Sequence, residues 1–299
     1  MMTIIKPLDI AENMLVSNVP IDDAPAWVPG ATYAKGAQVV HGLHVWEALA
    51  AVPAGVRPGA ETVTEANPAK WLDTGAVNRW RMFDDKVGTV TSREGSVAVI
   101  LQPGRATSAL AALNLTGRTL EVDMTDPVEG HVYHRSVPLA DAGVGNWYEY
   151  FFQPIGLISD ITLTDLPSYP QATLAMTVSS SDIAKIGSLS IGTQEEIGEA
   201  VYGTSVGITD YSRKELDQYG NASILERSFA KRAEYDVLIE TAQVSRVQRL
   251  LASIRARPVV WIGDESMEAT IVYGFFKDFS IAIAGPSASG VTITVEGLT

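Results

Sequence analysis

The chain has 299 residues, of which 46% are hydrophobic and 19% charged, and its formal net charge at pH 7 is −13. A chain of this length and composition forms two or three folded domains, so the class of intrinsically disordered proteins is excluded. The negative charge disfavours nucleic-acid binding, which needs a basic surface, and the absence of cysteine excludes disulfides and thiolate metal sites.

Residues 1–22 are predicted to form an extended N-terminal arm. Their hydrophobic residues alternate only weakly, and the segment ends at Asp22, shortly before Pro25. We expect such an arm to pack on a neighbouring subunit; an unfolded leader is the alternative. The segment lacks the three regions of a signal peptide, and the chain has no apolar run of eighteen residues, so we expect neither that route of secretion nor membrane insertion.

Residues 23–76 are predicted to form a small β module rich in aromatic side chains. Its large rings lie among Gly and Pro turns and flank two short β-runs: the rings are Trp27, Tyr33, Trp46 and Trp71, and the runs are residues 38–41 and 43–48. A domain this short without a disulfide has little core, so some of these rings must be structural.

The spacing W-x-P-G-x-T-Y-x-x-G-x-x-V-x-x-G-x-x-x-W, followed by P-x-x-W-x-x-x-G, resembles the small carbohydrate-binding modules of bacterial chitinases and cellulases. This resemblance implies that Trp27, Tyr33, Trp46 and Trp71 are carbohydrate-binding rings on which a sugar face stacks. The sequence departs from the family at Trp46, where Tyr is more common. A module that serves only as a spacer or docking element is the alternative.

Residues 77–194 contain many short apolar runs separated by turn residues, which favours a β-sandwich. The runs cover residues 97–101, 109–113, 120–124, 132–133, 148–152, 158–163, 174–178 and 186–191. The order of the runs resembles the jelly-roll, galactose-binding-like domains of phage tail and adhesin proteins.

Two histidines in this region, His131 and His134, lie near Asp126 and Glu129. The intervening Val and Tyr indicate a strand, in which residues three apart face opposite sides. We therefore predict no joint metal site. The carboxylate pairs Asp84-Asp85 and Asp123 with Asp126 have the residue types of a glycan hydrolase, but such pairs are common in an acidic chain.

No nucleophile and base, metal site or cofactor loop can be assigned from the sequence, which lacks cysteine and an H-E-x-x-H motif. We therefore predict no catalytic residues, no cofactor and no enzyme activity. A polysaccharide-binding accessory protein and a glycan-degrading enzyme are the alternatives.

Residues 195–299 are predicted to combine β-strands with one helix. Hydrophobic residues recur at helical spacing on one face of residues 242–256, with Thr241 as a predicted N-cap and Pro258 as the stop. The opposite face carries arginines, which indicates a solvated face or a surface that pairs with a neighbour's carboxylates. Three β-runs follow the helix.

The order of helix, "RPVVWIGDE", "YGFFKDF" and terminal strand resembles the ring-forming core of distal-tail and baseplate proteins of siphophages. This resemblance implies a tail-tube-like or distal-tail-like β-sandwich with one packed α-helix. It also implies a structural protein of the virion's tail tip or baseplate that is assembled in the host cytoplasm. The expected partners are further copies of the chain, in a hexameric ring or alternatively a trimer, other tail-tip, baseplate and tail-tube proteins, and bacterial surface glycans.

Overall fold

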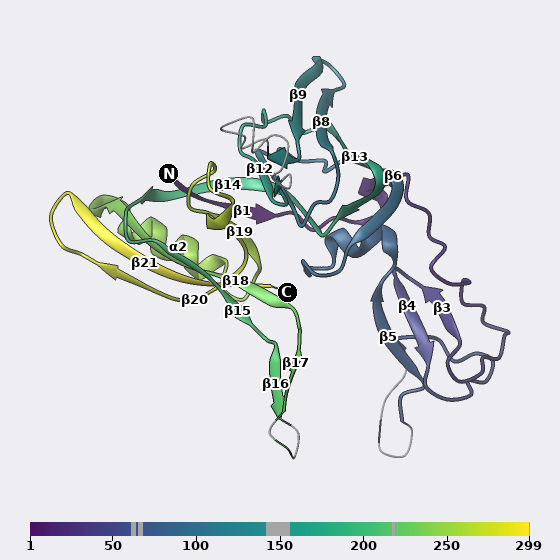
Figure 1. Cartoon of the computed structure of the whole chain (residues 1–299). Coiled ribbons are helices and arrows are strands. Elements are labelled where there is room, and N and C mark those ends of the chain that lie inside the picture. Colours follow the sequence, from purple (N-terminus) through teal and green to yellow (C-terminus); the bar gives the residue numbers. More distant parts are fainter. Residues whose placement is uncertain (61–63, 65–67, 142–155, 217–218, 220, 299) are drawn as a thin grey trace, which may run out of the picture.

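The computed structural model describes residues 1–60, 64, 68–141, 156–216, 219 and 221–298, and shows a mainly β protein with several sheets (Figure 1). The predicted mainly β fold class is confirmed. Its strands are β1 (Met2–Pro7), β2 (Leu15–Ser17), β3 (Gln38–His41), β4 (His44–Ala48), β5 (Trp71–Ala76), β6 (Thr91–Leu101), β7 (Ala109–Leu113), β8 (Thr119–Asp126), β9 (Gly130–Pro138), β10 (Ala140–Asp141), β11 (Gly156–Leu157), β12 (Ile161–Leu163), β13 (Thr173–Ile186), β14 (Ser188–Ala200), β15 (Ser205–Asp210), β16 (Arg213–Leu216), β17 (Ala222–Leu225), β18 (Phe229–Glu240), β19 (Val259–Ile262), β20 (Ile271–Ala282) and β21 (Ala288–Gly297).

Helical elements are short. The α-helix in the described part of the chain is α2 (Val244–Ser253). Single turns of 3₁₀-helix are η1 (Glu12–Met14), η3 (Thr241–Gln243) and η4 (Glu268–Thr270), and η2 (Asn78–Phe83) is longer. No helix among the described residues is long and apolar enough to cross a membrane.

The N-terminal module is a three-stranded antiparallel sheet, β3-β4-β5. A two-residue turn joins β3 to β4, and its Gly42 has a φ of +64°, which a side chain would disfavour. One face of the sheet packs on a small core around Val39 and Trp71. On the other face, Val45 packs on Trp80 of η2. This second hydrophobic cluster attaches the module to the rest of the chain.

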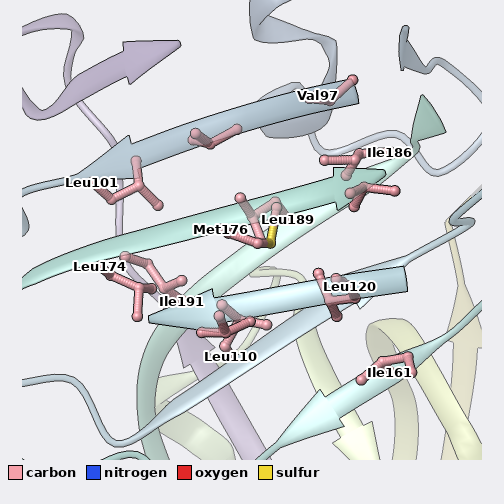
Figure 2. Packing of buried hydrophobic residues seen from close by; sticks show 14 of the residues in the cluster. Val97, Leu101, Leu110, Leu120, Ile161, Leu174, Met176, Ile186, Leu189 and Ile191 are labelled. Atoms are coloured by element: carbon pink, nitrogen blue, oxygen red, sulfur yellow. The ribbon is translucent and has the colours of Figure 1, made fainter. Parts of the chain in front are cut away.

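The middle of the chain forms a β-sandwich. A five-stranded sheet, β2-β6-β13-β8-β9, packs on β12, β7 and the beginning of β14, and the largest hydrophobic core lies between them (Figure 2). The strands show the expected alternation: in β8, Leu120, Val122 and Met124 are buried while the residues between them are more exposed. Every residue of β7 is buried, because both of its faces are covered.

The C-terminal strands close into a barrel. The antiparallel order β14-β1-β19-β20-β21-β18 returns to its start because β18 also pairs with β14, at Glu199 and Ala200. Helix α2 packs its hydrophobic face, Val247, Leu250 and Leu251, into the same core as Trp261. Strand β15 extends this sheet beyond β18 and forms its edge.

The first residues are not an arm but part of this barrel. Residues 2–7 form β1, which lies between β14 and β19 of the same chain and contributes the fully buried Met2, Ile4 and Ile5 to two cores. Short apolar runs look alike in an arm and in a central strand, so their partners could not be inferred locally. Strand β14 likewise continues across the predicted boundary at residues 194 and 195, and the sandwich and the barrel share it.

Two further local expectations differ from the structure. Thr241 does not cap α2: its hydroxyl donates to the carbonyl of Gly285, 2.8 Å away, and η3 precedes the helix. The apolar run 186–191 is not one strand, since β13 ends at Ile186 and β14 begins at Ser188. The predicted run 148–152 lies outside the described residues.

Candidate functional site

The four predicted carbohydrate-binding rings have different surroundings. Trp71 is 4% exposed and belongs to the module core, where its Nε1–H donates to the carbonyl of Val56 at 3.1 Å. Its ring and that of Tyr33 meet in a T-shaped arrangement, with centroids 5.3 Å apart. Trp71 therefore presents no ring face to a ligand and stabilises the fold of the module.

Tyr33 is half-buried and fixes the loop that carries Trp27. Its hydroxyl oxygen accepts a hydrogen bond from the backbone N–H of Val28 at 2.8 Å. Its own backbone exchanges two hydrogen bonds with Val52 across the module. Because its ring packs on Trp71 and its hydroxyl binds the backbone of Val28, Tyr33 mainly connects the loop that carries Trp27 to the module core.

Trp27 lies at the open edge of β3. Its backbone N–H donates to the carbonyl of Val40 at 2.8 Å, and the N–H of Val40 donates to the carbonyl of Pro25 at 2.9 Å. This short pairing places the half-buried Trp27 ring against His41, edge to face, with centroids 5.1 Å apart. The result is a surface of two rings from neighbouring backbone segments.

Trp46 supports the same surface from β4. Its Nε1–H donates to the carbonyl of His41 at 3.2 Å, and its six-membered ring lies against Gly59, where an added Cβ would come within 3.1 Å. Trp46 is half-buried. Trp27, His41 and Trp46, together with Arg57, are called the ring surface below.

Arg57 completes the ring surface with charge. Its Nε–H donates to Nε2 of His41 at 2.8 Å, and since a guanidinium only donates, the neutral imidazole carries its proton on Nδ1. Partial burial and the charge of Arg57 lower the pKa of His41 below its ordinary value of 6.5. Apolar ring faces beside hydrogen-bond donors suit a sugar, which offers C–H groups on one face and hydroxyls at its edge.

The sequence analysis missed His41 and Arg57 as members of this surface. His41 precedes the hairpin turn and pairs with His44, which was a readable signal, but Arg57 comes from a loop whose path depends on tertiary packing. His44 forms a separate contact, with its Nδ1 2.9 Å from a carboxylate oxygen of Asp73.

A second polar cluster lies on the five-stranded sheet. Nε2 of His131 and Nδ1 of His134 lie 3.1 Å and 2.7 Å from the same carboxylate oxygen of Asp123. Hydrogen bonds from the two imidazoles lower the pKa of this carboxyl below its ordinary value. The expectation that the two histidines face opposite sides of a strand is wrong.

A β-bulge in β9 is the reason. Asp123 pairs with His134 and Met124 with Tyr133, but Thr125 pairs with His131, so Val132 is an extra residue. The extra residue shifts the alternation by one, which brings His131 to the face of Thr125 and Asp123. Sequence periodicity does not reveal a bulge.

The carboxylate pairs that suggested a hydrolase have structural partners. Asp84 accepts from the hydroxyl of Thr89, and Asp85 accepts from the hydroxyl of Tyr273 at 2.7 Å. Asp126 is 7% exposed and accepts from two backbone N–H groups of the β8–β9 turn. Each of these three carboxylates therefore has a hydrogen-bond partner within the fold.

One motif escaped the sequence analysis. Residues 203–207 match G-x-S-x-G, a pattern that in hydrolases places a serine on a sharp turn between a strand and a helix. Here Ser205 is the first residue of β15, an exposed edge strand that is followed by β16. The match therefore lacks the strand-turn-helix setting that the motif needs.

No protein-family model matches the chain, and no curated protein matches it. Solved structures that match include chitosan-binding module 1 derived from a chitosanase/glucanase of Paenibacillus sp. IK-5, with 8% identity and a TM-score of 0.26. A selenomethionine-labelled mutant of that module matches with 7% identity and the same TM-score. Each match covers 38% of this chain and 83% of the other. Similarity this low carries no argument about this protein.

Proposed function

We propose that this chain is a non-catalytic structural protein that assembles with copies of itself and displays the module of residues 23–76 toward glycans. The tail tip or baseplate of a siphophage is the proposed setting, on the resemblance of the C-terminal sequence to ring-forming tail proteins. The observation that carries the proposal is the exposed apolar edge formed by β15 and the β16–β17 hairpin.

Strand β15 is exposed along nearly its whole length. It includes Val206 and Ile208, with exposed fractions of 47% and 60%. The hairpin that follows projects from the sheets (Figure 1) and carries Ile224 and Leu225, which are 75% and 48% exposed. A strand edge offers unpaired backbone groups to another strand, and apolar side chains beside it favour covering by protein.

A second copy of the chain is the proposed occupant of this edge. When one surface of a subunit contacts a different surface of the next, the contact repeats and closes into a ring if the rotation permits. Six copies are the first choice and three the alternative, both from the tail-protein resemblance.

The ring surface gives the assembly a binding role. Trp27 and His41 supply ring faces and Arg57 supplies donors, so a single module would bind a sugar weakly. Several modules on one assembly add their contacts on a polyvalent cell surface, which raises the overall affinity. A high affinity of each single module for a sugar is then not required.

Electron microscopy and light scattering of the full-length protein test the proposal. We expect a ring of six or three copies, and no fragments released from host lipopolysaccharide, peptidoglycan or capsule. A protein that stays monomeric at high concentration, also with its tail partners present, would contradict the assembly. Release of glycan fragments that a single Asp or Glu substitution abolishes would contradict the non-catalytic part.

A further inference from the structure

We propose that Asp123, His131 and His134 form a binding site for one divalent transition-metal ion, with Zn²⁺ as the preferred ion. The site lies on the outer face of the β8–β9 hairpin. It is independent of the ring surface and of the assembly proposed above.

The three side chains already converge on one point. The two imidazole nitrogens lie 3.1 Å and 2.7 Å from Oδ1 of Asp123, and one ligand atom from each residue lies within 4.8 Å of the others. Tetrahedral zinc, with bonds of about 2.0–2.2 Å, holds its ligand atoms roughly 3.3 Å apart. Small side-chain rotations therefore suffice to place an ion between the three groups.

The chemistry of the donor set selects the class of ion. Two imidazole nitrogens with one carboxylate oxygen suit zinc and neighbouring transition metals, whereas magnesium and calcium prefer sites made of oxygens. The side chains of His131, His134 and Asp123 are 57%, 54% and 40% exposed, so solvent reaches the cluster. Three protein ligands would leave a coordination position for water.

The backbone holds the cluster together without an ion. Asp123 and His134 are directly paired across β8 and β9, and the bulge at Val132 brings His131 to the same face. Bulges re-aim side chains at functional positions, and ligands on strands are positioned more rigidly than ligands on loops. Behind the bulge, the Tyr133 hydroxyl donates to Asp165 at 2.7 Å and ties β9 to another segment.

The local charge also favours a cation. Glu121 lies two residues before Asp123, on the same face of β8, and is exposed. The positive charge of nearby Arg135 is balanced by Asp165, with which it forms an ion pair at 3.2 Å. Among the described residues, Asp123, His131 and His134 form the one group of three His or acidic side chains whose ligand atoms all lie within 4.8 Å of one another.

The test uses untagged full-length protein, stripped with a chelator and titrated with Zn²⁺ at fixed neutral pH by calorimetry and equilibrium dialysis. We expect one Zn²⁺ per chain and a melting temperature that rises with the Zn²⁺ concentration, because an ion that binds only the folded chain stabilises it. The substitutions His134→Ala, which removes a direct ligand, and Asp123→Asn, which removes the charge of another, should each weaken binding by about 100-fold or more.

A matched control exchanges two neighbours. The double substitution His131→Val with Val132→His keeps composition and charge but moves the imidazole to the core side of the bulge, so binding should be lost while the metal-free protein still melts cooperatively. His44→Ala removes another surface histidine that contacts a carboxylate and should leave binding unchanged. Equal Zn²⁺ binding by the native protein and the exchanged variant, or no binding by the native protein, would overturn the proposal.

Discussion

Trp71 and Trp27 belong to the same module but contribute to it differently. Trp71 is enclosed by the module core and by the Val56 carbonyl, whereas Trp27 is half-buried and rests against His41. The spacing of the rings predicted a set of four aromatic positions but could not rank their burial. Burial of Trp71 depends on the loop that contains Val52 and Val56, whose path is decided by tertiary packing.

The first prediction compares truncation of these two rings. Trp71→Ala should cost roughly 3–5 kcal/mol of unfolding free energy and melt the module, because it empties the centre of a small core. Trp27→Ala should leave the melting temperature nearly unchanged and reduce retention on host cells. Thermal melting and cell-surface retention of both variants check this. Loss of the fold in Trp27→Ala, or unchanged retention, would show that the ring surface is structural.

The second prediction concerns the protonation of His41. Its pKa should lie below 6.5, and Arg57→Gln should raise it, because the nearby positive charge is removed while the partial burial remains. A lowered pKa means that the unfolded chain takes up the proton first, so the stability due to His41 is present above pH 6.5 and is lost as the pH falls toward the folded-state value. An NMR titration of the imidazole checks this, and a pKa that falls in Arg57→Gln would contradict it.

Elements were easier to predict than their partners. The runs that became β7 and β19 are short and continuously apolar, and β8, β21 and the helix α2 carry the periodicity of a strand or a helix in their own sequences. The bulge at Val132 and the position of β1 do not, because both depend on pairing with distant residues. The expectation that His131 and His134 face opposite sides was wrong for this reason, because regular alternation describes a strand without a bulge.

The third prediction concerns the pairing of β1 with β14. At Gly192, which pairs with Pro7, an added Cβ would lie 1.8 Å from the carbonyl oxygen of Lys6, a backbone atom that can move only with its strand. Gly192→Ala should therefore cost about 1–3 kcal/mol and increase amide exchange in β1. Gly290→Ala is the control, because an added Cβ there meets nothing within 4 Å. Equal melting of the two variants would show that β1 is dispensable to the barrel.

At the scale of the whole molecule, β14 belongs to both the sandwich and the barrel, which the sequence predicted as two domains with a boundary at residues 194 and 195. Its beginning, with Leu189 and Ile191, packs in the sandwich core, and its later Ile197 packs in the barrel core. The residues of this strand change from mostly apolar in its first half to three glutamates in its second half, so composition does not show that one strand continues across the predicted boundary. The sandwich and the barrel should therefore unfold together, while the module of residues 23–76 has a sheet and a core of its own.

The last prediction concerns assembly through β15. Substituting Val206→Lys together with Ile208→Lys places two charges on the exposed edge strand, and lysine on an edge disfavours pairing with another strand. Both residues are already exposed in the single chain, so the melting temperature of the monomer should change little. The variant should be a monomer in light scattering under conditions in which the native protein forms a ring.

Val128→Lys is the matched control, since Val128 is 83% exposed but lies in the turn between β8 and β9. A ring that persists in the double variant would place the contact between copies elsewhere on the molecule, and a ring lost in the control as well would mean that added charge alone prevents assembly.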